Sequence, residues 1–437
     1  MTPFVVKALQ LILSLSILIV LHELGHFIPA KIFKTRVEKF FLFFDVKFAL
    51  VKKKIGDTVY GIGWLPLGGY VKISGMIDES MDKEQMAQPP QPWEFRSKPS
   101  WQRLIIMLGG VTVNIIVGFA IYSMILGIYG RNITTNADMP NGFAIAEEFK
   151  QYGFQDGDKI LKVNGEEFEN VTDINKYLFL RDVTSIEVKH ENGNIQTIAI
   201  PEDIGTEMFQ KDILKPFVER RDPVIDTVLA DYPAAIAGFL KGDKILSVNG
   251  TDVAYWHEFT ANVVKNKEQE STIIINRDGQ DMTFLVKPNE DGIVGVNNFG
   301  KSTHIDYTFG ESITGGVGFG YNILKDYVAQ FKYVFTTKGA SQLGGFGAIG
   351  NLFPDTWDWM SFWQTTALIS IILAFMNILP IPALDGGHVM FLLYEMVSGR
   401  KPNDKFMEYA QMIGFFLLIA LVLFANGNDI YRAIFGG

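Results

Sequence analysis

The segment with the clearest chemical potential is His22-Glu23-Leu24-Gly25-His26. Residues four apart on a helix lie one above the other on the same face, so both imidazoles can bind one zinc ion. Glu23 lies one step around the helix, within reach of a water molecule at the metal. Because two histidines and a water leave a tetrahedral zinc ion one ligand short, the pattern requires a further ligand from elsewhere in the chain.

Asp385 is the candidate for that further ligand. It lies in the segment Asn377-Ile-Leu-Pro-Ile-Pro-Ala-Leu-Asp-Gly-Gly-His388, where Pro380 and Pro382 must interrupt a helix. At membrane depth such a break normally occurs only where protein or a water-filled cavity satisfies the freed backbone groups. An aspartate directly after the break can turn inward to a metal. The alternative is a carboxylate that caps the helix starting at Gly386.

Composition restricts the chemistry and the partners. The 437 residues include six histidines and no cysteine, which excludes disulfides, thiolate ligands and a cysteine nucleophile. A metal site must therefore use His, Asp and Glu. The formal net charge of -9 argues against nucleic acid as the main partner, because phosphate binding needs clustered Lys and Arg. The hydrophobic content of 48% is an average over unlike parts, since the apolar residues are concentrated in a few stretches.

Four apolar stretches predict the helices that must position these residues. The stretch 4–21 carries only Lys7 as a charge and leads into the His-Glu motif, without the small-residue cleavage site of a signal peptide. The stretch 104–130 holds no charge across 27 residues. The runs 365–379 and 410–425 are shorter and can span a membrane only with their flanks. Ionisable groups in a span are costly unless paired or metal-bound, which favours a functional site over an ordinary polar helix end at the motif.

Basic residues predict the orientation of the spans. Lysines and arginines crowd the loop between the first two spans and the turn after the third, so both should be cytoplasmic. Both termini and the stretch 131–362 then lie outside the cytoplasm. The predicted order is first span (1–30), cytoplasmic loop (31–102), second span (103–130), two external domains (131–220 and 221–300), external amphipathic segment (301–362), third span (363–398) and fourth span (406–427).

The external stretch contains a duplication. Residues 153–165 and 238–250 match at ten of thirteen positions, with an offset of 85 residues. Each copy is followed by two β-rich runs that meet at a tight turn, Asn192-Gly193 in the first and Asp278-Gly279 in the second. The pattern predicts two small domains rich in β-structure. Their shared G-D-K-I-L-x-V-N-G motif resembles PDZ domains, over roughly residues 131–300.

Two further segments leave alternatives open. The apolar stripe from Ile313 to Phe335 has helical spacing, which fits either a buried face or a helix in the membrane interface. Residues 59–73 alternate apolar and small side chains around Pro66-Leu67-Gly68-Gly69. They predict a β-hairpin that dips into the membrane and pairs its edge with an extended substrate. Plain turn chemistry explains the glycines equally well.

Taken in this order, the motifs resemble the site-2 protease family of intramembrane zinc metalloproteases, and in particular its bacterial regulator-of-sigma-E protease branch. The resemblance covers essentially the whole chain and rests on these features: HELGH at 22–26, GIGWLPLGGYVK at 61–72, Gly110 and Asn114 in the second span, the tandem PDZ motif, and NILPIPALDGGH at 377–388. One departure is the run 344–350, GGFGAIG, where relatives often carry Ser-Gly-Pro-Ile-Gly.

The resemblance implies a polytopic α-helical membrane protein with four transmembrane helices, a membrane-associated β-hairpin and two extracytoplasmic PDZ domains of mixed α/β type. It implies one Zn²⁺ per chain on His22, His26 and Asp385, with Glu23 as catalytic acid and base. His388 is interpreted as a local polar residue. The residues expected to contact substrate are Asn377, Pro380, Pro382, Gly61, Gly63, Gly68, Gly69 and Asn114.

The implied function is cleavage of transmembrane segments in a bacterial inner membrane. The expected substrates are single-span, membrane-anchored regulators of the anti-sigma-factor type and leftover signal peptides, with the external domain trimmed beforehand and the PDZ pair acting as a size filter. An alternative is a non-catalytic membrane adaptor whose PDZ domains bind external peptides, for which loss of Glu23 would change nothing. A transporter would need matched repeats among the spans, and the sequence contains none.

Overall fold

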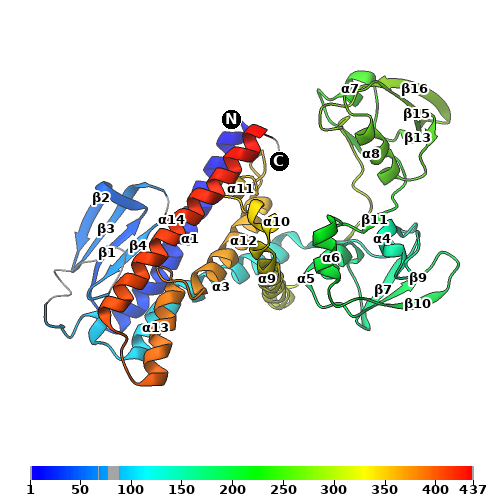
Figure 1. Ribbon diagram of the computed structural model, residues 1–437. Helices are drawn as coiled ribbons and strands as arrows, with labels where there is room; N and C mark the ends of the chain where they lie inside the picture. The colour runs from blue at the N-terminus through cyan, green and yellow to red at the C-terminus, as the bar shows by residue number, and fades with distance from the viewer. Residues whose placement is uncertain (1, 67, 77–87, 436–437) are drawn as a thin grey trace. The chain divides into compact units, whose positions relative to one another are not determined.

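The computed structural model describes residues 2–66, 68–76 and 88–435 (Figure 1). Leu67, in the predicted hairpin, and residues 77–87, in the predicted cytoplasmic loop, lie outside the described residues. The chain divides into two compact units. The helical unit comprises Met1–Gly130 together with Asp306–Gly437, and the duplicated unit comprises Arg131–Ile305.

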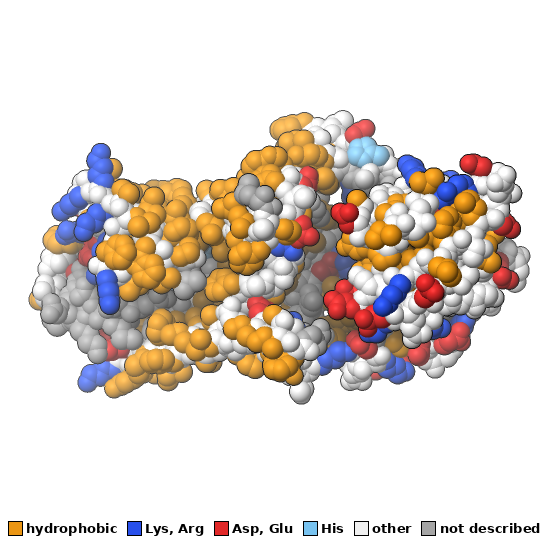
Figure 2. Space-filling view, turned by 90° about the horizontal axis from the view of Figure 1, so that it is seen from above, with side chains coloured by type: hydrophobic (Ala, Val, Ile, Leu, Met, Phe, Trp, Pro, Cys, Tyr) orange, Lys and Arg blue, Asp and Glu red, His pale blue; other side chains and the backbone are white. Residues whose placement is uncertain are grey.

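Four helices of the helical unit are long and apolar enough to cross a membrane: α1 (Pro3–Ile32), α3 (Ser100–Tyr129), α12 (Trp359–Ile378) and α14 (Asp404–Phe435). Even α12, the shortest with 20 residues, is about 30 Å long, which matches the hydrocarbon core of a bilayer. Hydrophobic side chains cover much of the visible face of this unit (Figure 2). The four helices agree in number, length and composition with the four predicted spans.

The predicted third span, 363–398, is divided in the structure. Helix α12 ends at Ile378, and a separate helix, α13 (Asp385–Ser398), begins after six intervening residues. Pro380 and Pro382 lack the N–H groups that would continue the helix, which explains the break. Asp385 is thus the first residue of a new helix.

Helix α3 lies at the centre of the helical unit and packs against α1, α9, α12 and α13. Its contact with α1 is made backbone to backbone at the His-Glu motif. A Cβ atom added to Gly25 would lie 2.4 Å from the carbonyl oxygen of Gly109 and 2.8 Å from Cα of Gly110. The glycines therefore let the two helices approach at the level of the predicted metal site.

The predicted hairpin at 59–73 is wrong in its topology. Four strands, β1 (Val37–Leu42), β2 (Phe44–Ile55), β3 (Thr58–Leu65) and β4 (Tyr70–Ile73), form one sheet in the order β2-β3-β1-β4. Strand β1 pairs with β3 in parallel and with β4 antiparallel, so it separates the two strands of the predicted hairpin. Both edges of β3 are occupied, one by β2 across a two-residue turn and the other by β1, so neither is left for β4.

The glycines of this sheet serve close packing rather than turns alone. Gly61 and Gly63 lie inside β3, where added Cβ atoms would lie 2.4 Å from the Phe41 ring and 2.2 Å from the Phe44 carbonyl oxygen. Gly69 precedes β4, and its added Cβ would lie 2.5 Å from the Ile19 side chain of α1. Gly61 and Gly63 thus allow close packing within the sheet, and Gly69 lets the start of β4 approach α1.

Helix α9 (Phe309–Phe331) turns its glycine face inward. A Cβ on Gly316 would lie 2.4 Å from Cα of Ser123 in α3, while Ile313, Val317 and Tyr321 on the apolar stripe are exposed. For these residues the buried-face interpretation is wrong. Their exposure favours the interfacial alternative.

Three short elements follow α9, namely η3 (Lys332–Phe335), α10 (Thr337–Ser341) and α11 (Phe346–Gly350). The N-terminal end of α11, residues 345–348, is held by α14. The N–H groups of Gly345 and Ala348 donate to Asp429 Oδ2 over 3.0 and 3.1 Å, and that of Phe346 donates to Asn426 Oδ1 over 3.2 Å. On the predicted cytoplasmic side, η1 (Phe95–Ser97) precedes α3.

The duplication is visible in the duplicated unit as two sheets of the same strand order. The first has the order β10-β9-β7-β8 and the second β16-β15-β13-β14. Each covers its own hydrophobic core. The predicted Asn-Gly and Asp-Gly turns join β9 to β10 and β15 to β16. The strands are β7 (Lys159–Val163), β8 (Glu166–Glu167), β9 (Ser185–Lys189), β10 (Ile195–Ala199), β13 (Lys244–Val248), β14 (Thr251–Asp252), β15 (Ser271–Arg277) and β16 (Gln280–Val286).

Shorter elements complete this unit. Strands β5 (Arg131–Ile133) and β18 (Thr303–Ile305) pair where the chain enters and leaves it. The remaining strand pairs are β6 (Phe143–Ile145) with β11 (Phe217–Glu219) and β12 (Thr227–Val228) with β17 (Val296–Asn297). The helices are α4 (Glu147–Lys150), η2 (Val171–Asp173), α5 (Ile174–Leu180), α6 (Ile204–Lys211), α7 (Pro233–Ala237) and α8 (Trp256–Lys265).

The two repeats differ at one buried aspartate. Asp158 pairs with His190 over 2.6 Å in the first, and the equivalent Asp243 pairs with Arg277 over 2.7 Å in the second. Hydrogen bonds to Gln196 and Asp158 raise the pKa of His190 above its ordinary 6.5, and burial raises the pKa of Asp158 above 3.8. Both shifts mean that the folded repeat binds protons more tightly than the unfolded chain. The stability that these two shifts contribute to the folded repeat is therefore lost as the pH rises.

Candidate metal centre

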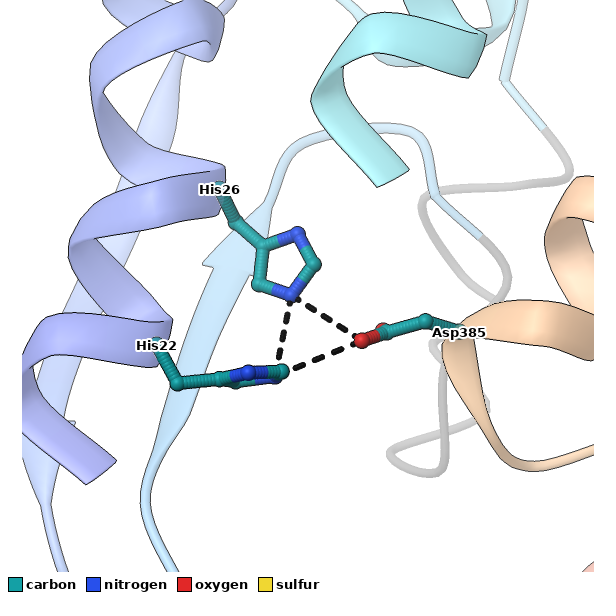
Figure 3. A group of neighbouring side chains, drawn as sticks. All are labelled: His22, His26 and Asp385. Atoms are coloured by element: carbon teal, nitrogen blue, oxygen red, sulfur yellow. Dashed lines mark hydrogen bonds and ion pairs between the residues drawn. The ribbon is translucent and has the colours of Figure 1, made fainter. Parts of the chain in front are cut away.

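Three donor atoms from two distant parts of the sequence meet in the helical unit (Figure 3). His22 and His26 project from α1, and Asp385 projects from the start of α13. The two Nε2 atoms are 3.2 Å apart, and each lies 3.3 Å from Asp385 Oδ2. Ligands about 2.05 Å from a tetrahedral zinc ion are separated by about 3.3 Å, so this nearly equilateral triangle has the dimensions of one face of a zinc site.

The surroundings of Asp385 Oδ2 indicate that a cation fits between this oxygen and the two imidazoles. The atom is buried, yet neither imidazole meets it in a proper hydrogen bond. A buried carboxylate oxygen without a partner is costly, and a metal ion shared with the two histidines would satisfy it. The nitrogen and oxygen donors are those that zinc accepts in catalytic sites. The residues therefore fit a zinc ion.

The outer nitrogen of each imidazole has a partner in α3. His26 Nδ1 lies 2.8 Å from the backbone carbonyl oxygen of Ile106, which requires Nδ1–H and leaves Nε2 free to bind a metal. His22 Nδ1 lies 3.2 Å from the amide nitrogen of Asn114, whose Oδ1 is buried without a partner. Turning the amide over would let Oδ1 accept from His22 Nδ1–H and satisfy both groups.

Space for the two rings comes from a glycine. A Cβ added to Gly110 of α3 would lie 2.4 Å from His26 Nε2 and 2.5 Å from His22 Cε1. Any larger residue at this position would occupy the place of the imidazoles. The sequence resemblance includes Gly110, but its steric role follows only from the packing of α1 on α3.

The three donors and Glu23 line a cavity of about 660 Å³ between α1, the sheet and the link to α13. Strand β4 forms one wall, and the backbone of Val71 in this strand interacts with the Glu23 carboxylate. At the rim, Tyr70 donates a hydrogen bond of 2.7 Å to Asp45, which also lies 3.3 Å from Lys39. A carboxylate, a zinc-type donor set and an edge strand thus face one partly open cavity.

The site combines a His-Glu-x-x-His helix, an aspartate at an interrupted span and apolar helices. A match to a known family accompanies this combination along most of the chain. Residues 10–421 match the profile of peptidase family M50. The chain belongs to peptidase family M50. It is a zinc metalloprotease with several membrane-spanning helices.

Curated relatives agree with the M50 assignment over nearly their full lengths. A Campylobacter jejuni protein, named provisionally as a zinc metalloprotease, is 29% identical and aligns over 98% of this chain and 94% of its own length. The regulator of sigma E protease of Haemophilus influenzae is 28% identical over 96% of this chain and 98% of its own. The regulator of sigma-E protease RseP of Salmonella typhimurium is 26% identical over 96% and 97%.

The residues expected to contact substrate occupy different places in this M50 protease. Gly69 lines the cavity. Asn377 is half-buried at the end of α12, Pro380 is exposed and Pro382 is half-buried on the link before α13. Asn114 is fully buried against His22. Their roles toward substrate stay predictions, as do those of Gly61, Gly63 and Gly68.

Among the polar cavity residues that sequence reasoning missed is Gln411 of α14. It is buried, and its amide contacts both Ala383 and His388, on either side of Asp385. A single glutamine in an apolar helix carries no spacing signal. Its isolation among apolar residues at membrane depth is the one feature that could have indicated it.

Proposed function

We propose that this M50 protease is an intramembrane endopeptidase that holds one zinc ion on His22, His26 and Asp385, with Glu23 as acid and base. The observation that carries the proposal is the triangle of donor atoms, 3.2 to 3.3 Å on each side, beside a glutamate in one cavity. Supporting it are the unpartnered Asp385 Oδ2 and the partners of both outer imidazole nitrogens.

Zinc, when bound, supplies a Lewis acid that activates water and polarises a carbonyl group. Glu23 accepts the proton of the attacking water and returns it to the leaving amine. Asn114 and the Ile106 carbonyl hold the two imidazoles with Nε2 toward the metal. Asp385, fixed at the start of α13, completes the donor set from the opposite wall.

The substrate has to be locally extended, because the carbonyl groups of a transmembrane helix are engaged in its own hydrogen bonds. Strand β4 is the edge strand of its sheet among the described residues, and it lines the cavity beside Glu23. An extended substrate segment adds to this edge by main-chain hydrogen bonds. Gly69 keeps the strand close to α1 and so presents the scissile bond to Glu23.

The substrates are single-span proteins anchored in the bilayer of a bacterial inner membrane, of the anti-sigma-factor type, together with leftover signal peptides. The names of the Haemophilus and Salmonella relatives support the regulatory substrate class. Both termini and the duplicated unit lie outside the cytoplasm, following the basic residues of the loops. The repeats of the duplicated unit are PDZ domains, which exclude substrates whose external domain has not been trimmed.

Co-expression with a single-span model substrate tests the proposal. Glu23→Gln and Asp385→Ala should abolish cleavage while the protein accumulates normally. Asp404→Ala is the matched control, because it removes an exposed carboxylate from the first turn of another helix, α14. Equal cleavage by all variants would refute the catalytic assignment and favour a non-catalytic adaptor. About one zinc per purified chain, lost in His22→Ala, is the expected metal content.

A further inference from the structure

Asp385 reaches the two histidines at the end of a short link, residues 379–384. Ala383, two residues before Asp385, has a φ angle of 76°. This left-handed conformation brings the Cβ atom of an L-residue too close to its own backbone, so alanine rarely adopts it. Such residues persist where the surrounding structure imposes the conformation. The link therefore depends on a partner that holds Ala383.

That partner is Gln411 of α14. The backbone N–H of Ala383 donates to Gln411 Oε1, and Gln411 Nε2 lies 2.9 Å from Nε2 of His388. Gln411 is only 5% exposed. One side chain thus bridges the residue two positions before Asp385 and the residue three positions after it. Both ends of the turn that directs Asp385 are fixed from a different helix.

The backbone of α14 comes equally close to this link. A Cβ atom on Gly414 would lie 1.9 Å from the carbonyl oxygen of Pro382. Along the 32 residues of α14, the buried positions are Gln411, Gly414 and Ala425. Two of these three lie on the link, so contact with the link is a main attachment of an otherwise exposed helix.

We propose that Gln411 is a positioning residue for the metal site: it holds Ala383 in its left-handed conformation and thereby directs Asp385 toward His22 and His26. Docking of α14 is then coupled to completion of the zinc ligand set. The inference rests on the proposed role of Asp385 as a ligand.

The test measures zinc affinity and turnover on the full-length protein in detergent. Gln411→Leu removes both hydrogen bonds and puts an apolar side chain of similar size in place of the glutamine. It should weaken zinc binding, measured by competition with a chelator, by about 10- to 100-fold, as for other residues that orient a ligand. At saturating zinc, kcat should fall more than KM for the model substrate changes, because substrate contacts stay in place.

The second substitution separates positioning from general support. Glycine adopts positive φ about as readily as negative φ, so Ala383→Gly in the Gln411→Leu background should recover most of the zinc affinity. Asn426→Ala is the matched control, since it removes another amide of α14 that accepts a backbone N–H, away from the link. It should retain the zinc affinity of the parent protein.

The outcomes are distinct. Unchanged zinc affinity in Gln411→Leu would overturn the inference. No recovery in the double variant, or an equal loss in Asn426→Ala, would show that α14 acts only as general support, which also overturns it. If Asp385→Ala binds zinc as the parent protein does, the ligand assignment itself is wrong, whereas loss of zinc there with full binding in Gln411→Leu refutes only the role of Gln411.

Discussion

Gly110→Ala should remove zinc from this protease while leaving the helices intact. The added methyl carbon would lie 2.4 Å from His26 Nε2 and 2.8 Å from His22 Nε2, the atoms proposed to bind the metal. Ordinary contact between such atoms begins at about 3.4 Å, so at least one ring has to retreat by about 1 Å. Neither ring can simply rotate away, because Ile106 and Asn114 fix their outer nitrogens.

A retreat of this size exceeds what the metal tolerates. Zinc–ligand distances vary by about 0.2 Å, and a misplacement of about 1 Å typically costs a factor of about 100. The expected loss of zinc affinity is therefore about 100-fold or more, equivalent to about 2.7 kcal/mol. Helix propensity acts in the opposite direction, since alanine is favoured over glycine by about 1 kcal/mol in a helix.

Zinc content and chelator competition on the purified variant measure the effect, with circular dichroism to verify the helices. Gly118→Ala is the control, because it lies two turns further along α3 and its added Cβ meets Cγ1 of Ile371 at 2.8 Å, a comparable steric conflict away from both imidazoles. If Gly110→Ala and Gly118→Ala bind zinc equally well, the steric argument and the proposed ligand set are both refuted.

Three other outcomes are expected. Asn114→Leu should weaken zinc binding by about 10- to 100-fold through loss of the partner of His22 Nδ1, and unchanged affinity would contradict the outer-ligand role. Gly69→Ala should displace β4 from α1, where the added Cβ would lie 2.5 Å from Cγ2 of Ile19, and so lower kcat/KM at least 10-fold with zinc retained, whereas loss of zinc would point to a wider collapse. Between pH 6 and 8, hydrogen-exchange protection, measured against the intrinsic exchange rate at each pH, should fall in the first repeat, because the raised His190 pKa removes stability as the pH rises. It should stay constant in the second repeat, where Arg277 holds the pKa of Asp243 low, and an equal loss of protection in both repeats would refute the assignment.

The sequence predicts those features that depend on local spacing or on the residue types of a short segment. The spacing of His22 and His26 follows from helix geometry, and uncharged stretches of membrane length identify the spans. The turn at Asp278-Gly279 has positive φ at both residues and the turn at Asn192-Gly193 has it at Gly193, and these residue types adopt such angles readily. Asp385 could be named because prolines break the helix directly before it.

What the sequence could not predict depends on partners distant along the chain. The parallel pairing of β1 with β3 places a strand between two segments that looked adjacent, and no local pattern signals such a crossover. Ala383 has a left-handed φ that its residue type does not predict, because the residue that holds it there, Gln411, lies 28 residues later. Gly110 looked like any glycine of a membrane helix until α1 was packed against it.

The start of α11 receives a stabilising contact from a part of the chain that is synthesised later. The family resemblance leads us to expect a proline in the run 344–350, and a proline has no backbone N–H. Here Ala348 keeps its N–H and donates it to Asp429 of α14, 81 positions further on. This contact can form only after α14 has been made and has packed in place, so the folding of this segment is completed by a helix that follows it.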